Sequence, residues 1–136
     1  MTKYVLDTCI CSYLIKRTPD ISSTIERHII KHSSDGICIT IFNHAELFTG
    51  VKLKDSVKLK KAVEDLVERF TLIPFSEEAS HKYAEIRSSL KKNGKVIDDM
   101  DMLIAACTMA ENAVLITNNE KHFSHMGGLD IQNWTI

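Results

Sequence analysis

The chain opens with Lys3-Tyr4-Val5-Leu6-Asp7-Thr8, a short apolar run that leads directly into an acid. The run is β-prone and contains no Gly or Pro, and Asp7-Thr8 is typical of the start of a helix. Strands that alternate with helices are typical of a parallel sheet with right-handed crossovers. We therefore expect Asp7 to lie at the carboxyl end of the first strand of an α/β fold.

The same alternation continues along the rest of the chain. Further short apolar runs predict strands at residues 37–39, 71–74, 114–117 and 129–131. Apolar residues at helical spacing predict helices within residues 8–14, 21–30, 40–54, 56–70, 76–93 and 99–112. We predict one domain over residues 1–136, with a central, mainly parallel sheet flanked by helices on both faces.

Composition narrows the classes of function. The 136 residues are 44% apolar and 26% charged, and no apolar run approaches the roughly 20 residues of a membrane-spanning helix. No signal-peptide pattern follows Met1, so we expect a cytoplasmic protein that does not contact membranes. The net charge of −1 means that any nucleic-acid surface must be local. The four cysteines lack the spacing of a metal site and are expected to be reduced core residues.

Acids and one amide lie at the predicted strand ends and helix starts: Asp7, Glu46, Asp101 and Asn119. The carboxyl ends of parallel strands form the crevice in which ligands collect, so these side chains are expected to converge. Carboxylates that are packed together repel one another unless a cation neutralises them. Mg²⁺ prefers oxygen ligands, and the sequence therefore predicts a Mg²⁺ or Mn²⁺ site suited to the hydrolysis of a phosphodiester.

Each acid alone also fits a structural role. Asp7 fits a helix cap, and the segments from Asn43 to Glu46 and from Asp98 to Asp101 fit a cap residue followed three positions later by an acid. His122 and His125 fit a solvated turn better than a metal site.

The chain resembles a known family at several places. Tyr4-Val5-Leu6-Asp7-Thr8 is similar to the opening of PIN-domain ribonucleases. Later motifs resemble the VapC toxins of bacterial toxin–antitoxin pairs: Ala45-Glu46-Leu47-x-x-Gly50, Gly94-Lys95-x-Ile97-x-x-x-Asp101-x-x-Ile104-Ala105-Ala106, and Leu115-Ile116-Thr117-Asn118-Asn119-x-x-x-Phe123. The resemblance runs from Tyr4 to Trp134 and implies a PIN-like domain.

The resemblance implies a metal-dependent endoribonuclease that cleaves a structured RNA, often a tRNA, and so inhibits translation. It also implies a homodimer, and a cognate antitoxin that blocks the acidic pocket in a larger assembly. Asp7, Glu46 and Asp101 match the catalytic, metal-binding acids of the family, and Thr117 would orient the neighbouring carboxylates. Asn119 stands where relatives often have a fourth acid. Asp98 or Asp99 could supply the missing charge, although a capping role suits them better.

RNA is held mostly through phosphate contacts from Lys and Arg. The candidates are Arg87, Lys91, Lys92 and Lys95 near the predicted helix before Asp101, with a second cluster at Lys52, Lys54, Lys58, Lys60 and Lys61. A solvated helix face is the alternative for both clusters. The alternative for the whole chain is a catalytically weakened PIN-like module that binds RNA or a protein partner, which Asn119 alone supports.

Overall fold

A five-stranded sheet forms the centre of the molecule, in the order β3-β2-β1-β4-β5. The computed structural model describes residues 1–136. The strands are β1 (Lys3–Leu6), β2 (Gly36–Thr40), β3 (Thr71–Ile73), β4 (Val114–Ile116) and β5 (Asp130–Gln132). Every neighbouring pair is parallel, which confirms the predicted α/β fold.

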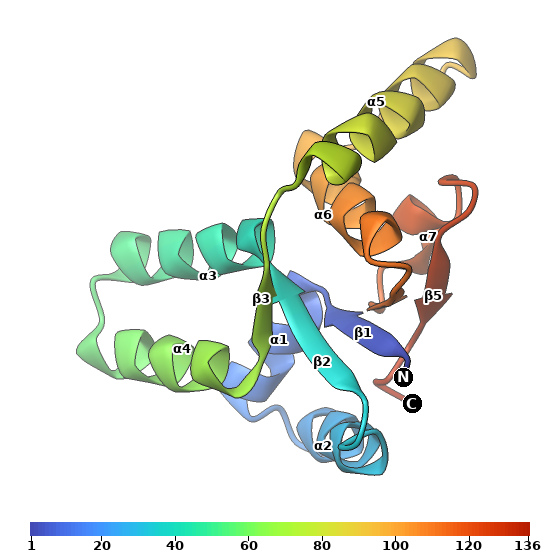
Figure 1. Ribbon diagram of the computed structural model, residues 1–136. Coiled ribbons are helices and arrows are strands. Elements are labelled where there is room, and N and C mark those ends of the chain that lie inside the picture. The colour runs from blue at the N-terminus through green and yellow to red at the C-terminus, as the bar shows by residue number, and fades with distance from the viewer.

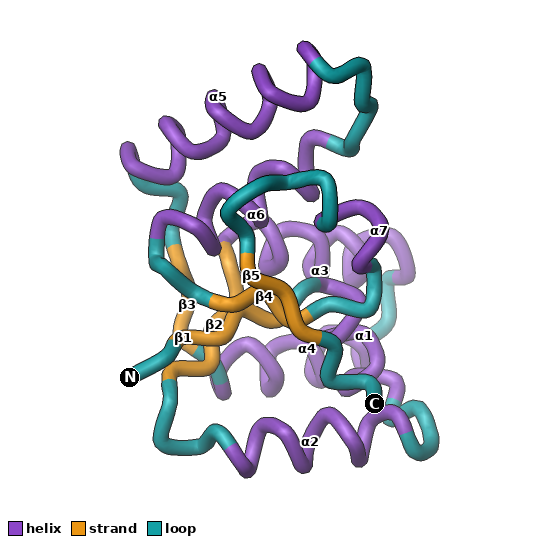
Figure 2. Tube along the Cα trace, turned by 90° about the vertical axis from the view of Figure 1, so that its right-hand side faces the viewer, coloured by secondary structure: helices purple, strands orange, loops and turns teal.

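Helices cover both faces of this sheet, as predicted (Figures 1 and 2). One face carries α1 (Thr8–Lys16), α2 (Ile21–Lys31), α3 (Ile41–Lys54) and α4 (Val57–Arg69). The other carries α5 (Glu77–Lys92), α6 (Asp99–Ala110) and the single-turn α7 (Glu120–Phe123). No helix combines the length and the apolar character that crossing a lipid bilayer requires.

Alternation along β1 divides the apolar core in two. Tyr4 and Leu6 pack with α1–α4, whereas Val5 packs with α5–α7. Successive side chains of a strand point to opposite faces, so a strand covered on both sides must be apolar at every position. Leu6 is fully buried, which stabilises the fold by about 1.5–3 kcal/mol. This requirement explains why the run that opens the chain is continuously apolar.

The strand order places the functional region between β1 and β4. The chain passes from β1 to β2 and β3 on one side, and returns to β4 and β5 on the other side. In open α/β sheets, ligands bind outside the carboxyl ends of the strands at such a switch point. The backbone N–H of Asp7 donates to the carbonyl of Ile116 at 2.9 Å, so the two strand ends lie directly side by side.

Candidate active site

Asp7 lies at the base of the site, directly after β1. Asp7 is 6% exposed, so it is held almost entirely within the protein. Oδ1 accepts a hydrogen bond from the backbone N–H of Thr8 at 2.9 Å, and Oδ2 accepts one from the Thr117 hydroxyl at 2.9 Å. Burial raises the pKa of Asp7, the bonds from Thr117 and Thr8 lower it, and the charge of Asp101 raises it again. The predicted helix cap is confirmed, and the same carboxylate faces another acid.

Glu46 comes from the second turn of α3. The Thr8 hydroxyl donates to Glu46 Oε1 at 2.6 Å. Burial is the main cause that raises the pKa of Glu46, the Thr8 bond lowers it, and the charges of Asp7 and Asp101 raise it further. These effects show that Asp7, Glu46 and Asp101, which the sequence places far apart, lie near enough to act on one another through their charges; we call the region around them the acidic pocket.

Asn43 supports Glu46 from beneath, and sequence reasoning missed this role. Its side chain is fully buried. Oδ1 accepts from the backbone N–H and the hydroxyl of Thr40 at 2.9 and 2.8 Å, and Nδ2 donates to the Thr8 hydroxyl at 3.0 Å. The predicted cap at Asn43 is wrong, because α3 begins at Ile41 and is capped by Thr40. A polar residue on the inward face of an apolar helix was the available signal.

Asp101 lies in the first turn of α6 and contacts a residue that the sequence did not indicate. Nδ1 of His122 lies 3.0 Å from Asp101 Oδ2 and 2.8 Å from Nδ2 of Asn119. The donor and acceptor roles in these two contacts depend on the tautomer of the imidazole. His122 is exposed, as predicted, but it lies on the single-turn α7 and contacts Asp101; His125 lies in the predicted solvated turn.

Thr117 connects the two strand ends. It is fully buried; its hydroxyl donates to Asp7 and accepts from the backbone N–H of Asn119 at 3.0 Å. The hydrogen bond is the contact expected of Thr117, and its role in orienting the catalytic carboxylate stays a prediction. The Cys9 thiol lies 3.7 Å from Asp7 Oδ2, and burial, with the charge of Asp7, raises the pKa of that thiol. Cys9 is therefore a neutral neighbour of the acids.

Asp98 and Asp99 take different positions around the start of α6. Asp98 caps α6 by accepting from the backbone N–H of Met100 at 3.2 Å, which confirms its predicted capping role. Asp99 Oδ1 accepts from the Tyr83 hydroxyl at 3.0 Å and from Arg87 Nη1 at 3.3 Å. The carboxylate of Asp99 is therefore engaged by α5 rather than by the other acids.

The predicted RNA-binding side chains on and after α5 lie together. Arg87, Lys91 and Lys95 line one cavity of about 200 Å³, together with Asp99. The Arg87 guanidinium also donates to the Tyr83 hydroxyl at 2.7 Å. Part of the positive charge of this cluster is consequently offset by Asp99, which forms an exposed ion pair with Arg87.

The donor set of the acidic pocket suits a hard cation. No three His, Cys, Asp or Glu side chains lie close enough together to ligate one ion directly. Mg²⁺ typically takes one or two carboxylates and completes its shell with water and substrate oxygens. Carboxylates that raise the pKa of one another fit such an ion, because a bound cation relieves their repulsion.

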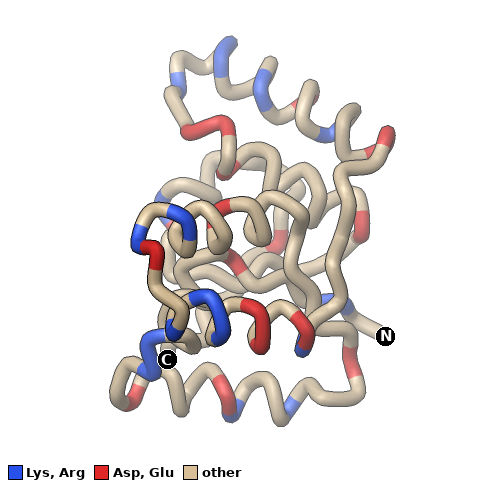
Figure 3. Tube along the Cα trace, turned by 90° about the vertical axis from the view of Figure 1, so that its left-hand side faces the viewer, with Lys and Arg blue, Asp and Glu red and all other residues tan.

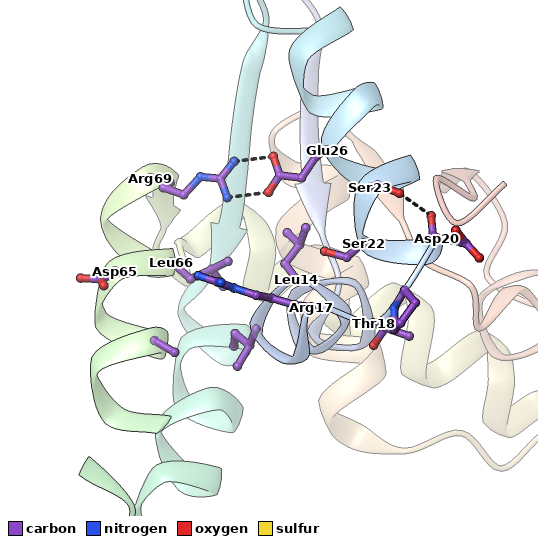
Figure 4. A pocket seen from close by; sticks show the side chains of 13 residues that line it. Leu14, Arg17, Thr18, Asp20, Ser22, Ser23, Glu26, Asp65, Leu66 and Arg69 are labelled. Atoms are coloured by element: carbon purple, nitrogen blue, oxygen red, sulfur yellow. Dashed lines mark hydrogen bonds and ion pairs between the residues drawn. The ribbon is translucent and has the colours of Figure 1, made fainter. Parts of the chain in front are cut away.

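A separate cavity of about 520 Å³ lies between α1, α2 and α4 (Figure 4). The walls include Leu14 and Leu66, and charged side chains surround them. Arg69 Nη1 and Nη2 donate to the two carboxylate oxygens of Glu26 at 2.8 and 2.9 Å. This pair joins α4 to α2, and as a largely solvated ion pair it stabilises the fold by at most about 1 kcal/mol.

The geometry of the site agrees with the sequence relationships of the chain. The profile of the PIN domain matches residues 4–129. The chain belongs to the PIN-domain family. Ribonuclease VapC2 of Rickettsia felis is 36% identical over 132 residues, which cover 96% of this chain and 97% of that protein. The tRNA(fMet)-specific endonuclease VapC of Shigella flexneri is 29% identical over 136 residues, with 99% and 100% covered.

Solved structures of PIN domains have the same fold. VapBC2 from Rickettsia felis, bound to a DNA fragment from its promoter, superimposes with a TM-score of 0.85 at 33% identity, over 98% of this chain and 99% of that chain. VapBC-1 from nontypeable Haemophilus influenzae gives a TM-score of 0.85 at 32% identity, with 99% and 100% covered. This PIN domain is therefore of the VapC type.

Proposed function

We propose that the chain is an endoribonuclease, the toxin of a toxin–antitoxin pair, that hydrolyses phosphodiester bonds with the help of a divalent metal ion. The observation that supports this proposal most strongly is the acidic pocket at the sheet switch point. Asp7, Glu46 and Asp101 act on one another there through their charges, which is costly in the absence of a cation. Residues 1–136 act in this proposal as a single PIN domain.

Mg²⁺ or Mn²⁺ is the cofactor that Asp7, Glu46 and Asp101 would hold, partly through bridging waters because the three side chains do not lie close enough to ligate one ion directly. When bound, such an ion lowers the pKa of a water ligand and stabilises charge on the phosphate. The chain keeps the acids in place for this task. Thr117 fixes Asp7 Oδ2 and Thr8 fixes Glu46 Oε1, so neither carboxylate has to reorganise when substrate arrives.

We propose a structured RNA, and a tRNA in particular, as the substrate, since a relative that matches the whole chain is named a tRNA(fMet)-specific endonuclease. This substrate places the activity in the cytoplasm, where translation takes place. Arg87, Lys91 and Lys95 contribute phosphate contacts beside the start of α6.

The partner of this nuclease is a cognate antitoxin, as in the VapBC complexes that share its fold. The cavity between α1, α2 and α4 suits an amphipathic segment of that antitoxin, because a few apolar side chains, among them Leu14 and Leu66, lie within a mostly polar and charged lining (Figure 4). Two copies of the nuclease form a homodimer, and antitoxin binding produces a larger assembly.

A PIN-like module that binds RNA without cutting it is the second candidate. Only Asn119 favours it, because an amide there removes one negative charge from the site. The amide is occupied by His122, and the three acids remain together around the pocket. The arrangement therefore supports cleavage.

Expression of the wild-type chain and of Asp7→Asn, followed by sequencing of newly formed RNA 5′ ends, tests this function. We expect growth arrest and one dominant cleavage site with the wild type, and neither with the variant. Purified wild-type protein should cleave the same RNA with Mg²⁺ and lose that activity in EDTA. Cleavage that survives both Asp7→Asn and EDTA would contradict the assignment of the acids and of the metal.

A further inference from the structure

A groove lies between α1 and α3, with α4 as its floor, and begins at Glu46 of the acidic pocket. Its volume is about 240 Å³. Thr8 and Glu46, which share a 2.6 Å hydrogen bond, line one end. Further along each helix the lining continues at matched positions: Ser12 and Lys16 on α1, and Gly50 and Lys54 on α3. Eight residues of helix span about 12 Å, so both lysines lie two turns beyond the acids.

The charges along this groove are arranged for an anion that also reaches the acidic pocket. Lys16 and Lys54 are exposed, and neither forms an ion pair. Glu46 is the only carboxylate in the lining. Lys positions also gather along the backbone where α3 ends and α4 begins, next to one acidic position (Figure 3). The lysines of the groove therefore differ from the α5 cluster, in which Arg87 forms an ion pair with Asp99.

Gly50 keeps the groove open. Glycine within a helix costs about 1 kcal/mol relative to alanine, so its presence in the middle of α3 needs a reason. Packing does not supply that reason, because a Cβ added at Gly50 would meet no atom within 4 Å. The missing side chain instead leaves space between the lysine pair and Glu46.

We propose that this groove binds the RNA backbone next to the scissile bond, with Lys16 and Lys54 holding a phosphate and Ser12 offering a hydroxyl donor. The inference rests on the proposed nuclease function and adds the direction in which the substrate leaves the pocket. Lysine binds phosphate as a point charge and needs no fixed geometry, which suits exposed side chains at a groove mouth. Leu59 and Val63 form the apolar floor of the groove, beneath the bound RNA backbone.

Equilibrium binding of a fluorescein-labelled tRNA(fMet) transcript tests the groove without requiring cleavage. All variants carry Asp7→Asn, so the RNA stays intact. Each phosphate contact to a single strand contributes about 0.7 to the slope of log K against log salt. Lys16→Ala with Lys54→Ala removes the one phosphate contact that the pair makes. It should therefore flatten the slope by about 0.7, and weaken binding about eightfold at 50 mM salt and about threefold at 200 mM.

Two further variants make the test specific. Arg27→Ala with Lys31→Ala removes the same charge from the exposed face of α2, outside the groove, and should change binding less than twofold. Gly50→Leu fills the groove without removing charge. It should weaken RNA binding while the Tm stays the same or rises, because leucine is the better helix former.

Unchanged affinity and slope in the double lysine variant would overturn the proposal. It would also be overturned if that variant kept its RNA affinity but lost binding of a labelled hexaglutamate peptide, since the groove would then be a docking site for an acidic protein segment. Failure of the proposed nuclease function can be told apart from failure of the groove, because in the first case the wild-type protein does not cut RNA.

Discussion

Replacement of Asp7 by asparagine tests the physical account of the acidic pocket, in addition to its activity. Asparagine has the shape of a protonated aspartic acid but never ionises. The pKa of Asp7 is raised because the folded protein disfavours its charged form, mainly through burial and also through the charge of Asp101. Asp7→Asn should therefore abolish cleavage and, without metal, make the protein more stable than the wild type.

The size of the gain follows from the contacts of Asp7. Burial of one charged group costs several kcal/mol, and two hydrogen bonds to the carboxylate recover about 1.5–3 kcal/mol each. The pKa of Asp7 is raised, so burial outweighs these bonds, and asparagine should relieve the remainder; a typical single-substitution effect is on the order of 1–2 kcal/mol. The unfolding entropy of a 136-residue chain is about 0.29 kcal/mol/K. The expected rise in Tm is therefore about 3–7 °C in EDTA at pH 7.

The pH dependence of this gain has a defined sign. The folded-state pKa of Asp7 lies above its unfolded value, so the cost of its charge is complete above the folded pKa. As the pH falls through the folded pKa, the native carboxyl protonates and the cost disappears. The advantage of Asp7→Asn should be largest near pH 7 and vanish below about pH 4, where the unfolded carboxyl is also protonated.

Thermal unfolding with and without Mg²⁺ measures both effects. At a Mg²⁺ concentration of 100 Kd the wild type should gain about 2.7 kcal/mol, whereas Asp7→Asn should gain much less. Asp130→Asn makes the same chemical change at an exposed position and should shift stability by less than about 0.5 kcal/mol. If Asp7→Asn were less stable than the wild type in EDTA at pH 7, burial and the charge of Asp101 would not outweigh the hydrogen bonds to the Asp7 carboxylate, and the argument for a cation would lose its basis.

Two supporting residues give further tests. Thr117→Val keeps the shape of a fully buried side chain but deletes a hydrogen bond that lowers the pKa of Asp7. The acid limb of the cleavage pH profile should therefore move to higher pH. An unmoved acid limb would mean that Thr117 does not lower the pKa of Asp7. Asn43→Ala removes the buried amide that donates to the Thr8 hydroxyl. It should lower the free energy of unfolding, measured with urea, by about 2–4 kcal/mol, and it should also lower kcat/KM. Normal stability and activity would show that Thr8 positions Glu46 without Asn43.

Local signals in the sequence predicted the elements well because each follows from the backbone repeat. Val5 and its neighbours form a strand buried on both faces, and a continuous apolar run is the direct consequence of that burial. Ser56 caps α4 and Ser76 caps α5, at the places where helix starts are predicted. The single turn of α7 escaped prediction, because four residues are too few for a helical period to appear.

The sequence also determined that acids follow the strands. Because the carboxyl ends of parallel strands meet at one edge of the sheet, an oxygen-rich site was expected there. Asp7, Glu46 and Asp101 were predicted from their positions alone, and resemblance to a family supported the choice. Spacing along the chain does not specify which side chain meets which, so the cap expected at Asn43 was wrong and the contact of the exposed His122 with Asp101 was missed.

Only the tertiary structure decided how these side chains meet. Thr117 reaches Asp7 across 110 positions of sequence because β4 pairs with β1. His122 reaches Asp101, and Thr8 joins Asn43 to Glu46, through packing between helices that are distant in the chain. Strand order and helix packing depend on burial summed over the whole core, whereas periodicity reports only the local backbone. For this reason the sequence could identify the acids, and the fold was needed to show what holds them and where the groove beside them leads.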